Sequence, residues 1–282
     1  MPERTGATVL ISSHLLSEME QMITQVGILN HGKMLFEGPL QELQKHSHDI
    51  WICLLVSMIM VVWVGGLAPS DPEELANAYS ALFYSIPVID SIVMPVFMAV
   101  IASRLWDMEI KGNTMKLFYT LQDRRSLFKG KVIFGVMEIF LTVFMEMGAF
   151  LLLGKIHGYT ETFPAGQFIY LAVCTTAVGV MLFFSEFFIM LIWNNPLPVL
   201  CVGIVGALLG LFSAFMPPIV SYFVPWGYFI PLSSYEVAEW AQATHTVTYG
   251  TRSFNWGLLA FTFALAVLFF YASWHRVQKQ EV

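Results

Sequence analysis

The stretch RLWDMEIKGNTMKLFYTLQDRRSLFKGK, residues 104–131, decides how the rest of the chain is arranged. It holds seven of the fourteen Lys and Arg residues, and long apolar runs flank it on both sides. A short loop of a membrane protein that is this basic stays on the cytoplasmic side. We therefore place this basic stretch inside the cell, which fixes the orientation of the apolar runs around it. Its cations are Arg104, Lys111, Lys116, Arg124, Arg125, Lys129 and Lys131.

The composition indicates that lipid is the solvent for much of the protein surface. The 282 residues are 57% hydrophobic and 12% charged, with 24 Phe and 16 Met, whereas a soluble domain carries about 25% charged residues. The formal net charge of −6 argues against a nucleic-acid partner. Cys53, Cys174 and Cys201 all lie in apolar runs without CxxC spacing. We interpret them as small buried apolar residues, not as a metal or disulfide set.

Six apolar runs are long enough to cross a membrane, because about 20 helical residues span the hydrocarbon core. They predict an all-α polytopic membrane protein with six transmembrane helices. The expected spans are Ile50–Ala68, Phe83–Ser103, Val132–Leu153, Phe168–Trp193, Leu197–Met216 and Asn255–Trp274. Asn194, Asn195 and Pro196 predict a tight cytoplasmic turn between the fourth and fifth spans, since Pro ends the preceding helix.

The remaining charges agree with this topology, in which both termini are cytoplasmic. Twelve of the fourteen Lys and Arg residues fall inside, and only Lys155 and Arg252 fall outside. Between the fifth and sixth spans, residues 217–254 are too apolar for a solvated loop and too interrupted by Pro to span. We expect a re-entrant or interfacial segment packed on the bundle. The alternative is a seventh, poorly formed span, which would move the C-terminus outside and spoil the charge count.

Residues 1–48 differ from the rest because they read as ordinary soluble sequence. ATVLISSH predicts a strand, residues 15–24 a short helix, and VGILNHGKMLFEG two strands around a turn. This stretch resembles the closing part of an ABC transporter ATPase, in which a strand ends at a switch histidine and a hairpin follows. The resemblance implies that His14 is the switch histidine and that the hairpin runs from Ile28 to Gly38.

The other parts of such an ATPase are missing from the sequence. It holds no G-x-x-x-x-G-K-[ST] phosphate loop, no LSGG signature and no hydrophobic run ending in Asp-Glu. Without them His14 has no phosphate or magnesium to act on, so we treat it as vestigial. We predict two domains, a truncated α/β ATPase remnant at 1–48 and a six-helix permease domain at 49–282. The alternative is a lid that completes a partner ATPase.

From about residue 50 onward the chain resembles a type-2 ABC transporter permease. The likeness rests on the six spans, on the Pro- and aromatic-rich segment after the fifth span, and on the loop between the second and third spans. In that family this loop carries a helix that docks into a groove of the ATPase. The resemblance implies that residues 109–131 form the ATPase-coupling loop, with a short helix at 115–122. Its candidate residues are Glu109, Lys111, Gly112, Asn113, Thr114, Asp123, Arg124, Arg125, Lys129 and Lys131.

Within the family, the short chain and the opening IWICLLVSMIMVVWVGG most resemble lantibiotic immunity permeases, which remove an antimicrobial peptide from the membrane. Bacitracin-type and other drug or lipid exporter permeases are close in form. The resemblance implies a multi-pass protein of the bacterial cell membrane that binds no cofactor. Its implied partners are an ABC ATPase subunit, which carries the ATP and Mg²⁺, a second permease copy or paralogue, membrane lipid, and a hydrophobic or cationic peptide substrate.

Three acidic residues, Glu138, Glu146 and Glu186, lie inside predicted spans. A carboxylate inside the membrane costs at least a few kcal/mol, so it usually faces the bundle interior or water. Glu138 is near enough to the basic stretch to reach Lys131 or the interface. Glu146 and Glu186 lie deeper, where they can pair with polar groups, line a path or bind a cationic peptide. We interpret Asp90, near the outer end of the second span, as reaching water.

An intramembrane enzyme is disfavoured, because the sequence contains no H-E-x-x-H and no convergent set of metal ligands. Gly203, Gly206 and Gly210 give the fifth span a small-residue face that allows close helix packing, either within the chain or between two copies. Two functions stay open: the membrane subunit of an ATP-driven exporter, or a passive immunity protein that binds the peptide without an ATPase.

Overall fold

The computed structural model describes residues 25–30, 33–39, 55–56, 58–59, 62–63, 65, 75–111, 124–241 and 246–279. The chain divides into two compact units, Met1–His48 and Asp49–Val282. In the first unit, β1 (Gln25–Asn30) and β2 (Lys33–Pro39) pair as an antiparallel hairpin, with an irregularity between Ile28 and Leu29. This hairpin confirms the two strands expected around the turn at residues 30–32. The expected strand and helix before residue 25 lie outside the described residues, as does His14.

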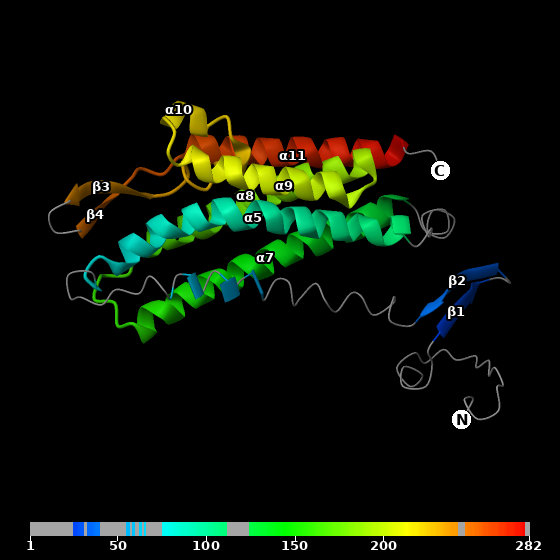
Figure 1. Ribbon diagram of the computed structural model, residues 1–282, viewed down its shortest axis with the longest axis horizontal. Coiled ribbons are helices and arrows are strands. Elements are labelled where there is room, and N and C mark those ends of the chain that lie inside the picture. Colours follow the sequence, from blue (N-terminus) through cyan, green and yellow to red (C-terminus); the bar gives the residue numbers. More distant parts are fainter. Residues whose placement is uncertain are drawn as a thin grey trace, which may run out of the picture. The chain divides into compact units, whose positions relative to one another are not determined.

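The second unit is a helical bundle (Figure 1). Five of its described helices are long and apolar enough to cross a membrane. They are α5 (Ala78–Lys111), α7 (Arg124–Ile156), α8 (Ala165–Trp193), α9 (Pro196–Ser213) and α11 (Trp256–Lys279). These helices confirm the second to sixth expected spans. The first expected span, residues 50–68, lies mostly outside the described part of the chain, so a sixth crossing helix stays a prediction.

Contacts between the helices show the direction in which each one runs, and so which residues share each end of the bundle. Phe83 and Trp106 of α5 pack on Phe168 and Phe187 of α8 in that order, so these two helices run parallel. Tyr170 and Phe184 of α8 meet Trp256 and Phe270 of α11 edge to face, so α11 runs the same way. The helices α7 and α9 run in the opposite direction. We call the end that holds Lys111, Arg124 and Lys279 the basic end, and the opposite end the hairpin end.

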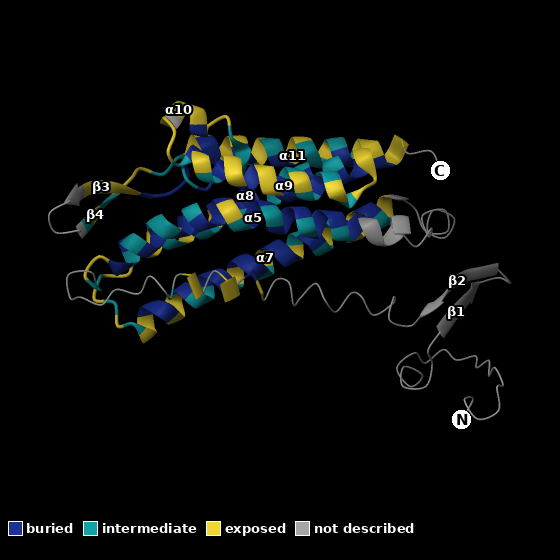
Figure 2. Cartoon of the chain, in the orientation of Figure 1, coloured by how far each residue is buried: buried dark blue, intermediate teal, exposed yellow. Residues whose placement is uncertain are grey.

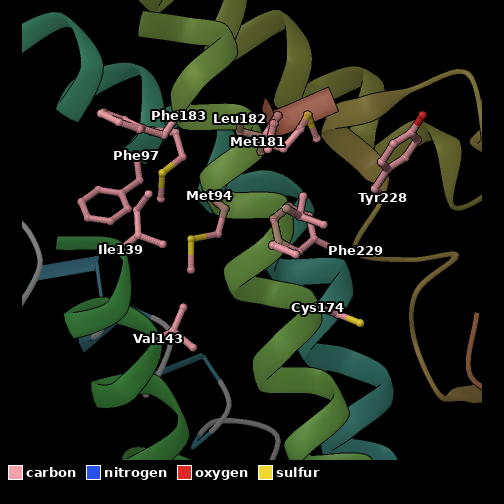
Figure 3. Packing of buried hydrophobic residues seen from close by; sticks show 14 of the residues in the cluster. Met94, Phe97, Ile139, Val143, Cys174, Met181, Leu182, Phe183, Tyr228 and Phe229 are labelled. Carbon is pink, nitrogen blue, oxygen red and sulfur yellow. The ribbon is translucent and has the colours of Figure 1, made fainter. Parts of the chain in front are cut away.

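The core lies between α5, α7 and α8 (Figure 3), where Met94 and Phe97 of α5 face Ile139 and Val143 of α7. Buried residues line α8 around most of its circumference, so α8 is the central helix. In contrast, α7, α9 and α11 each keep an exposed face (Figure 2) that carries large apolar side chains such as Phe144, Phe212 and Phe263. A membrane protein covers such faces with lipid or with another apolar helix.

The predicted turn between α8 and α9 is present, and its residues explain its sharpness. Asn194 ends α8 in the left-handed conformation with φ of 48°, which Asn adopts more readily than most residues. Asn195 caps α9, because its side-chain oxygen accepts a hydrogen bond from the Leu197 N–H at 3.0 Å. Pro196 occupies the first helical position, where its missing N–H costs nothing.

The small face of α9 packs inside the chain. A Cβ atom on Gly203 would lie 2.6 Å from the Ala99 Cβ of α5, and a Cβ on Gly206 would lie 2.3 Å from the Trp226 ring. Gly210 lies against backbone oxygens of Ser91 and Trp226. Of the two alternatives for this face, the structure therefore shows contact within one chain.

The segment between α9 and α11 packs on the bundle through short helical turns. These are α10 (Pro218–Ser221) and the 3-10 turn η3 (Pro225–Gly227), followed by the buried residues Tyr228, Phe229 and Leu232. The Tyr228 hydroxyl donates to the Tyr222 carbonyl at 2.8 Å, and burial raises the pKa of Tyr228 above its usual value, so this donor stays protonated. Whether the segment re-enters the membrane stays a prediction.

One element of this segment was not predicted. The strands β3 (Tyr235–Ala241) and β4 (Thr246–Thr251) form an antiparallel hairpin (Figure 1). Tyr235 packs against Phe83, and Tyr249 packs against Tyr84, so the hairpin is anchored to the start of α5. Tyr235 and Val237 alternate with Glu236 and Ala238, which is typical of a strand, but the register shift between Val237 and Glu239 breaks the alternation before Trp240.

Candidate functional site

The basic stretch is not the simple loop that the sequence suggested, because helices occupy both of its ends. The helix α5 continues to Lys111, so Glu109 and Lys111 lie in its last turn. The expected start of the third span at residue 132 was wrong, since α7 begins at Arg124. Residues 112–123 lie outside the described part of the chain, and with them Gly112, Asn113, Thr114, Asp123 and the expected helix at 115–122.

The cations at the start of α7 fall into two groups. Arg125 and Lys129 are exposed, whereas Lys131 is only 8% exposed. The Lys131 ammonium donates to the Leu105 carbonyl of α5 and lies 5.2 Å from the centre of the Trp106 ring. Lys131 therefore joins α7 to α5, through a charged hydrogen bond and a cation–π contact. Of the cations at the start of α7 whose burial is described, Arg125 and Lys129 are therefore the ones that face outward.

The ring beneath Lys131 is part of a layer of aromatic side chains at the basic end. Trp106 is fully buried and meets Phe187 of α8 edge to face at 5.7 Å. Phe128 of α7 packs on the same Phe187 and on Trp274 of α11. This layer therefore packs the first turns of α7 against α8 and α11, and α8 in turn against α5.

Glu138 and Glu186 are both buried in the bundle. Glu138 lies seven residues, or about two helical turns, after Lys131 on the same side of α7. The Glu186 carboxyl group of α8 lies beside the Trp226 indole N–H, without the geometry of a hydrogen bond. The structure thus directs both side chains into protein, as expected for carboxyl groups within a span.

Glu146 forms a second buried site together with two residues from other helices. It is 1% exposed and lies beside the Asp90 carboxyl group of α5, which is itself completely buried. The Thr175 hydroxyl of α8 donates to Asp90 Oδ2 at 3.3 Å. The interpretation of Asp90 as a residue that reaches water was therefore wrong. Its side chain turns inward, where Thr175 and Glu146 offer polar partners that lipid does not.

None of these sites is built to hold a metal ion, as far as the described residues go. No three His, Cys, Asp or Glu side chains among them converge. Asp90, Glu146 and Glu186 each keep at least one buried oxygen without a hydrogen-bond partner. The basic end thus exposes cations, and the interior of the bundle buries carboxyl groups.

Comparison with known proteins decides the family. The model of a family described as "ABC-2 family transporter protein" matches residues 41–210, which is more than half of the chain. The chain belongs to the ABC-2 transporter family. It is a multi-pass membrane protein. ABC-2 permeases are membrane transport components that work with an ABC ATPase partner and are not themselves the ATPase.

A short part of this ABC-2 permease is similar to a different kind of protein. Over 47 residues it is 50% identical to the "Bacitracin transport ATP-binding protein BcrA" of Bacillus licheniformis. The match covers 17% of the permease and 15% of BcrA, so the chain spans only a small part of that relative. No solved structure matches the permease.

Sequence reasoning about the ABC-2 permease missed Asp90, Thr175 and Trp226 as members of polar sites. Asp90 lies within an expected span, so it met the criterion by which Glu146 and Glu186 were selected. Nothing in the sequence distinguished Thr175 from other hydroxyl residues in apolar runs. Trp226 lies in the segment after the fifth span, whose path over Gly206 no periodic pattern predicts.

Proposed function

We propose that the chain is the permease subunit of an ATP-driven exporter that removes an antimicrobial peptide from the membrane. The observation that carries the proposal is the pair of exposed cations, Arg125 and Lys129, at the start of a helix that is tied to the whole bundle. In an ABC-2 permease this is where a separate ATPase can push. Closure of the ATPase would tilt α7 and α5 together, because Lys131 joins them.

The assembly that we propose contains two permease chains and two ATPases. The ATPases carry the ATP and Mg²⁺, and the permease binds no cofactor. Residues 109–131 are the coupling segment, on the cytoplasmic side, and both termini share that side. The exposed apolar faces of α9 and α11 offer room for a second permease copy or paralogue as well as for lipid.

The similarity to BcrA favours a second candidate substrate. Its 47 matched residues are close in number to the 48 residues of the first unit, which supports the proposal that residues 1–48 derive from the closing part of such an ATPase. BcrA is named for bacitracin transport. A bacitracin-type exporter is therefore the alternative to lantibiotic immunity, and a hydrophobic or cationic peptide fits both.

Purification of the tagged permease from cells that also express its ATPase tests this proposal against a passive peptide-binding protein. We expect an ATPase to co-purify, and we expect ATP hydrolysis to disappear when the phosphate-loop lysine of that ATPase is replaced. The His14→Ala variant should leave ATP turnover unchanged, because His14 has no phosphate loop or magnesium ligand within its own chain. Peptide resistance that persists in cells without any such ATPase would support the passive role.

A further inference from the structure

Transport coupling at the basic end does not explain why the carboxyl groups of Asp90 and Glu146 are buried together. They come from α5 and α7 and meet beside Thr175 of α8, so three helices converge on them. Asp90 lies twelve residues after Ala78, and Glu146 lies ten residues before Ile156. These spacings place the pair about 15–18 Å from the hairpin end of the two helices, deep within the bundle.

The pair has no positive neighbour among the described residues. The side chains that interact with Asp90 are Glu146 and Thr175, and Glu146 interacts with Asp90 alone. On α8, Tyr170 and Cys174 interact with each other, and in α11 the charged side chains lie in the last turns. On α9 the described titratable residue is Cys201, which is exposed. Among the residues whose side chains the structure describes, the groups that act on the two carboxyl groups are Asp90, Glu146 and Thr175 themselves.

Both oxygens of Glu146 and one oxygen of Asp90 are buried without a hydrogen-bond donor. Two ionised carboxylates that touch each other in a buried site are strongly unfavourable, because each is desolvated and each repels the other. Neither can donate a hydrogen bond to the other while both are ionised. A single proton resolves both problems, since it removes one charge and turns one carboxyl group into a donor.

From this geometry we infer that Asp90 and Glu146 bind one proton between them inside the bundle. Separation of α5 from α7 would break the pair and admit water, and the two carboxyl groups would then ionise independently. The proton is therefore held in the closed bundle and released in an open one. An open state is favoured at high pH, which makes the conformational equilibrium of the permease sensitive to pH.

Infrared spectroscopy of the full-length permease in lipid nanodiscs tests this inference without any ATPase or peptide, so its outcome does not depend on the proposed function. We expect a carboxylic-acid C=O band that shifts in D₂O and disappears as the pH is raised. Asp90→Asn and Glu146→Gln should each shift this band and the pH at which it disappears, because each leaves one buried carboxyl group without its acidic partner. Glu186→Gln is the matched control, because Glu186 is equally buried but lies eleven residues beyond Thr175 on α8. That variant removes any acid band of Glu186 itself and should keep the band that responds to Asp90→Asn and Glu146→Gln.

Thermal unfolding gives an independent measurement. If the folded protein holds a proton that the unfolded chain releases at neutral pH, stability falls as pH rises. The unfolding equilibrium constant of the wild type should therefore increase by up to about tenfold per pH unit relative to Glu146→Gln, whose amide does not titrate. Parallel pH profiles for these two proteins, or a wild-type spectrum without a titrating acid band, would overturn the inference. A wild-type spectrum without such a band overturns the inference even if a variant does not fold.

Discussion

Replacing both Arg124 and Arg125 by glutamate is expected to abolish peptide resistance while the permease stays folded. The two residues begin α7, and Arg125 is exposed, so a docked ATPase would meet two negative charges in place of two positive ones. A surface of the ATPase that binds these arginines carries negative charge, and like charges placed across an interface cost several kcal/mol. The helix itself should not suffer, since acidic residues in the first turn of a helix stabilise it by about 0.3–1 kcal/mol. Loss of function can therefore be separated from loss of folding.

Resistance to the peptide and co-purification of the ATPase are the two measurements for this variant. A matched control is Arg276→Glu with Lys279→Glu, because both residues are exposed in the last turn of α11 at the same end of the bundle. That control makes the same change in net charge away from α7, so it should retain most of the resistance. Full resistance in the Arg124→Glu, Arg125→Glu variant would show that the start of α7 does not couple to an ATPase.

Replacing Gly203 by alanine is expected to destabilise the bundle by about 1–3 kcal/mol, the usual cost of overpacking. The new Cβ would lie 2.6 Å from the Ala99 Cβ and 3.1 Å from the Pro95 carbonyl oxygen. Neither atom can rotate away, because one is a Cβ and the other belongs to the backbone. The contact is relieved only if α9 moves away from α5, which would open the small face along its length.

Thermal unfolding in detergent of Gly203→Ala and Gly148→Ala forms a matched comparison. Both glycines lie inside apolar helices, but a Cβ on Gly148 of α7 meets nothing within 4 Å. Alanine favours a helix by up to about 1 kcal/mol over glycine, so Gly148→Ala should be neutral or stabilising. Equal unfolding temperatures for the two variants would show that α9 and α5 do not pack as closely as the structure has them.

The spans were predictable because lipid demands a long apolar run, and that demand is written directly in the sequence. The residues at which the helices begin and end were less predictable. The third span seemed to begin after Lys131, since four cations precede it, yet α7 starts at Arg124. Lys131 lies within the bundle because the Leu105 carbonyl and the Trp106 ring satisfy its charge. Such compensation comes from another helix and leaves no local trace in the sequence.

The buried polar sites were also predictable only in part. Glu146 was recognisable as an interior residue, because a carboxyl group in a span must avoid lipid. Its partners were not, since the side of α5 that bears Asp90 becomes known only once α7 and α8 pack against it. The β3–β4 hairpin was missed for another reason: its strand pattern is short, and it follows a Pro-rich segment that suggested irregular structure.

Cysteine labelling in intact cells tests most directly whether the basic end faces the cytoplasm. The substitutions are Arg125→Cys at the basic end and Glu239→Cys in β3, both at exposed positions, in a variant without Cys53, Cys174 and Cys201. With a maleimide that does not cross membranes, Glu239→Cys should react at once, and Arg125→Cys should react only after the cells are permeabilised. Labelling of Arg125→Cys in intact cells, with Glu239→Cys protected, would contradict the account.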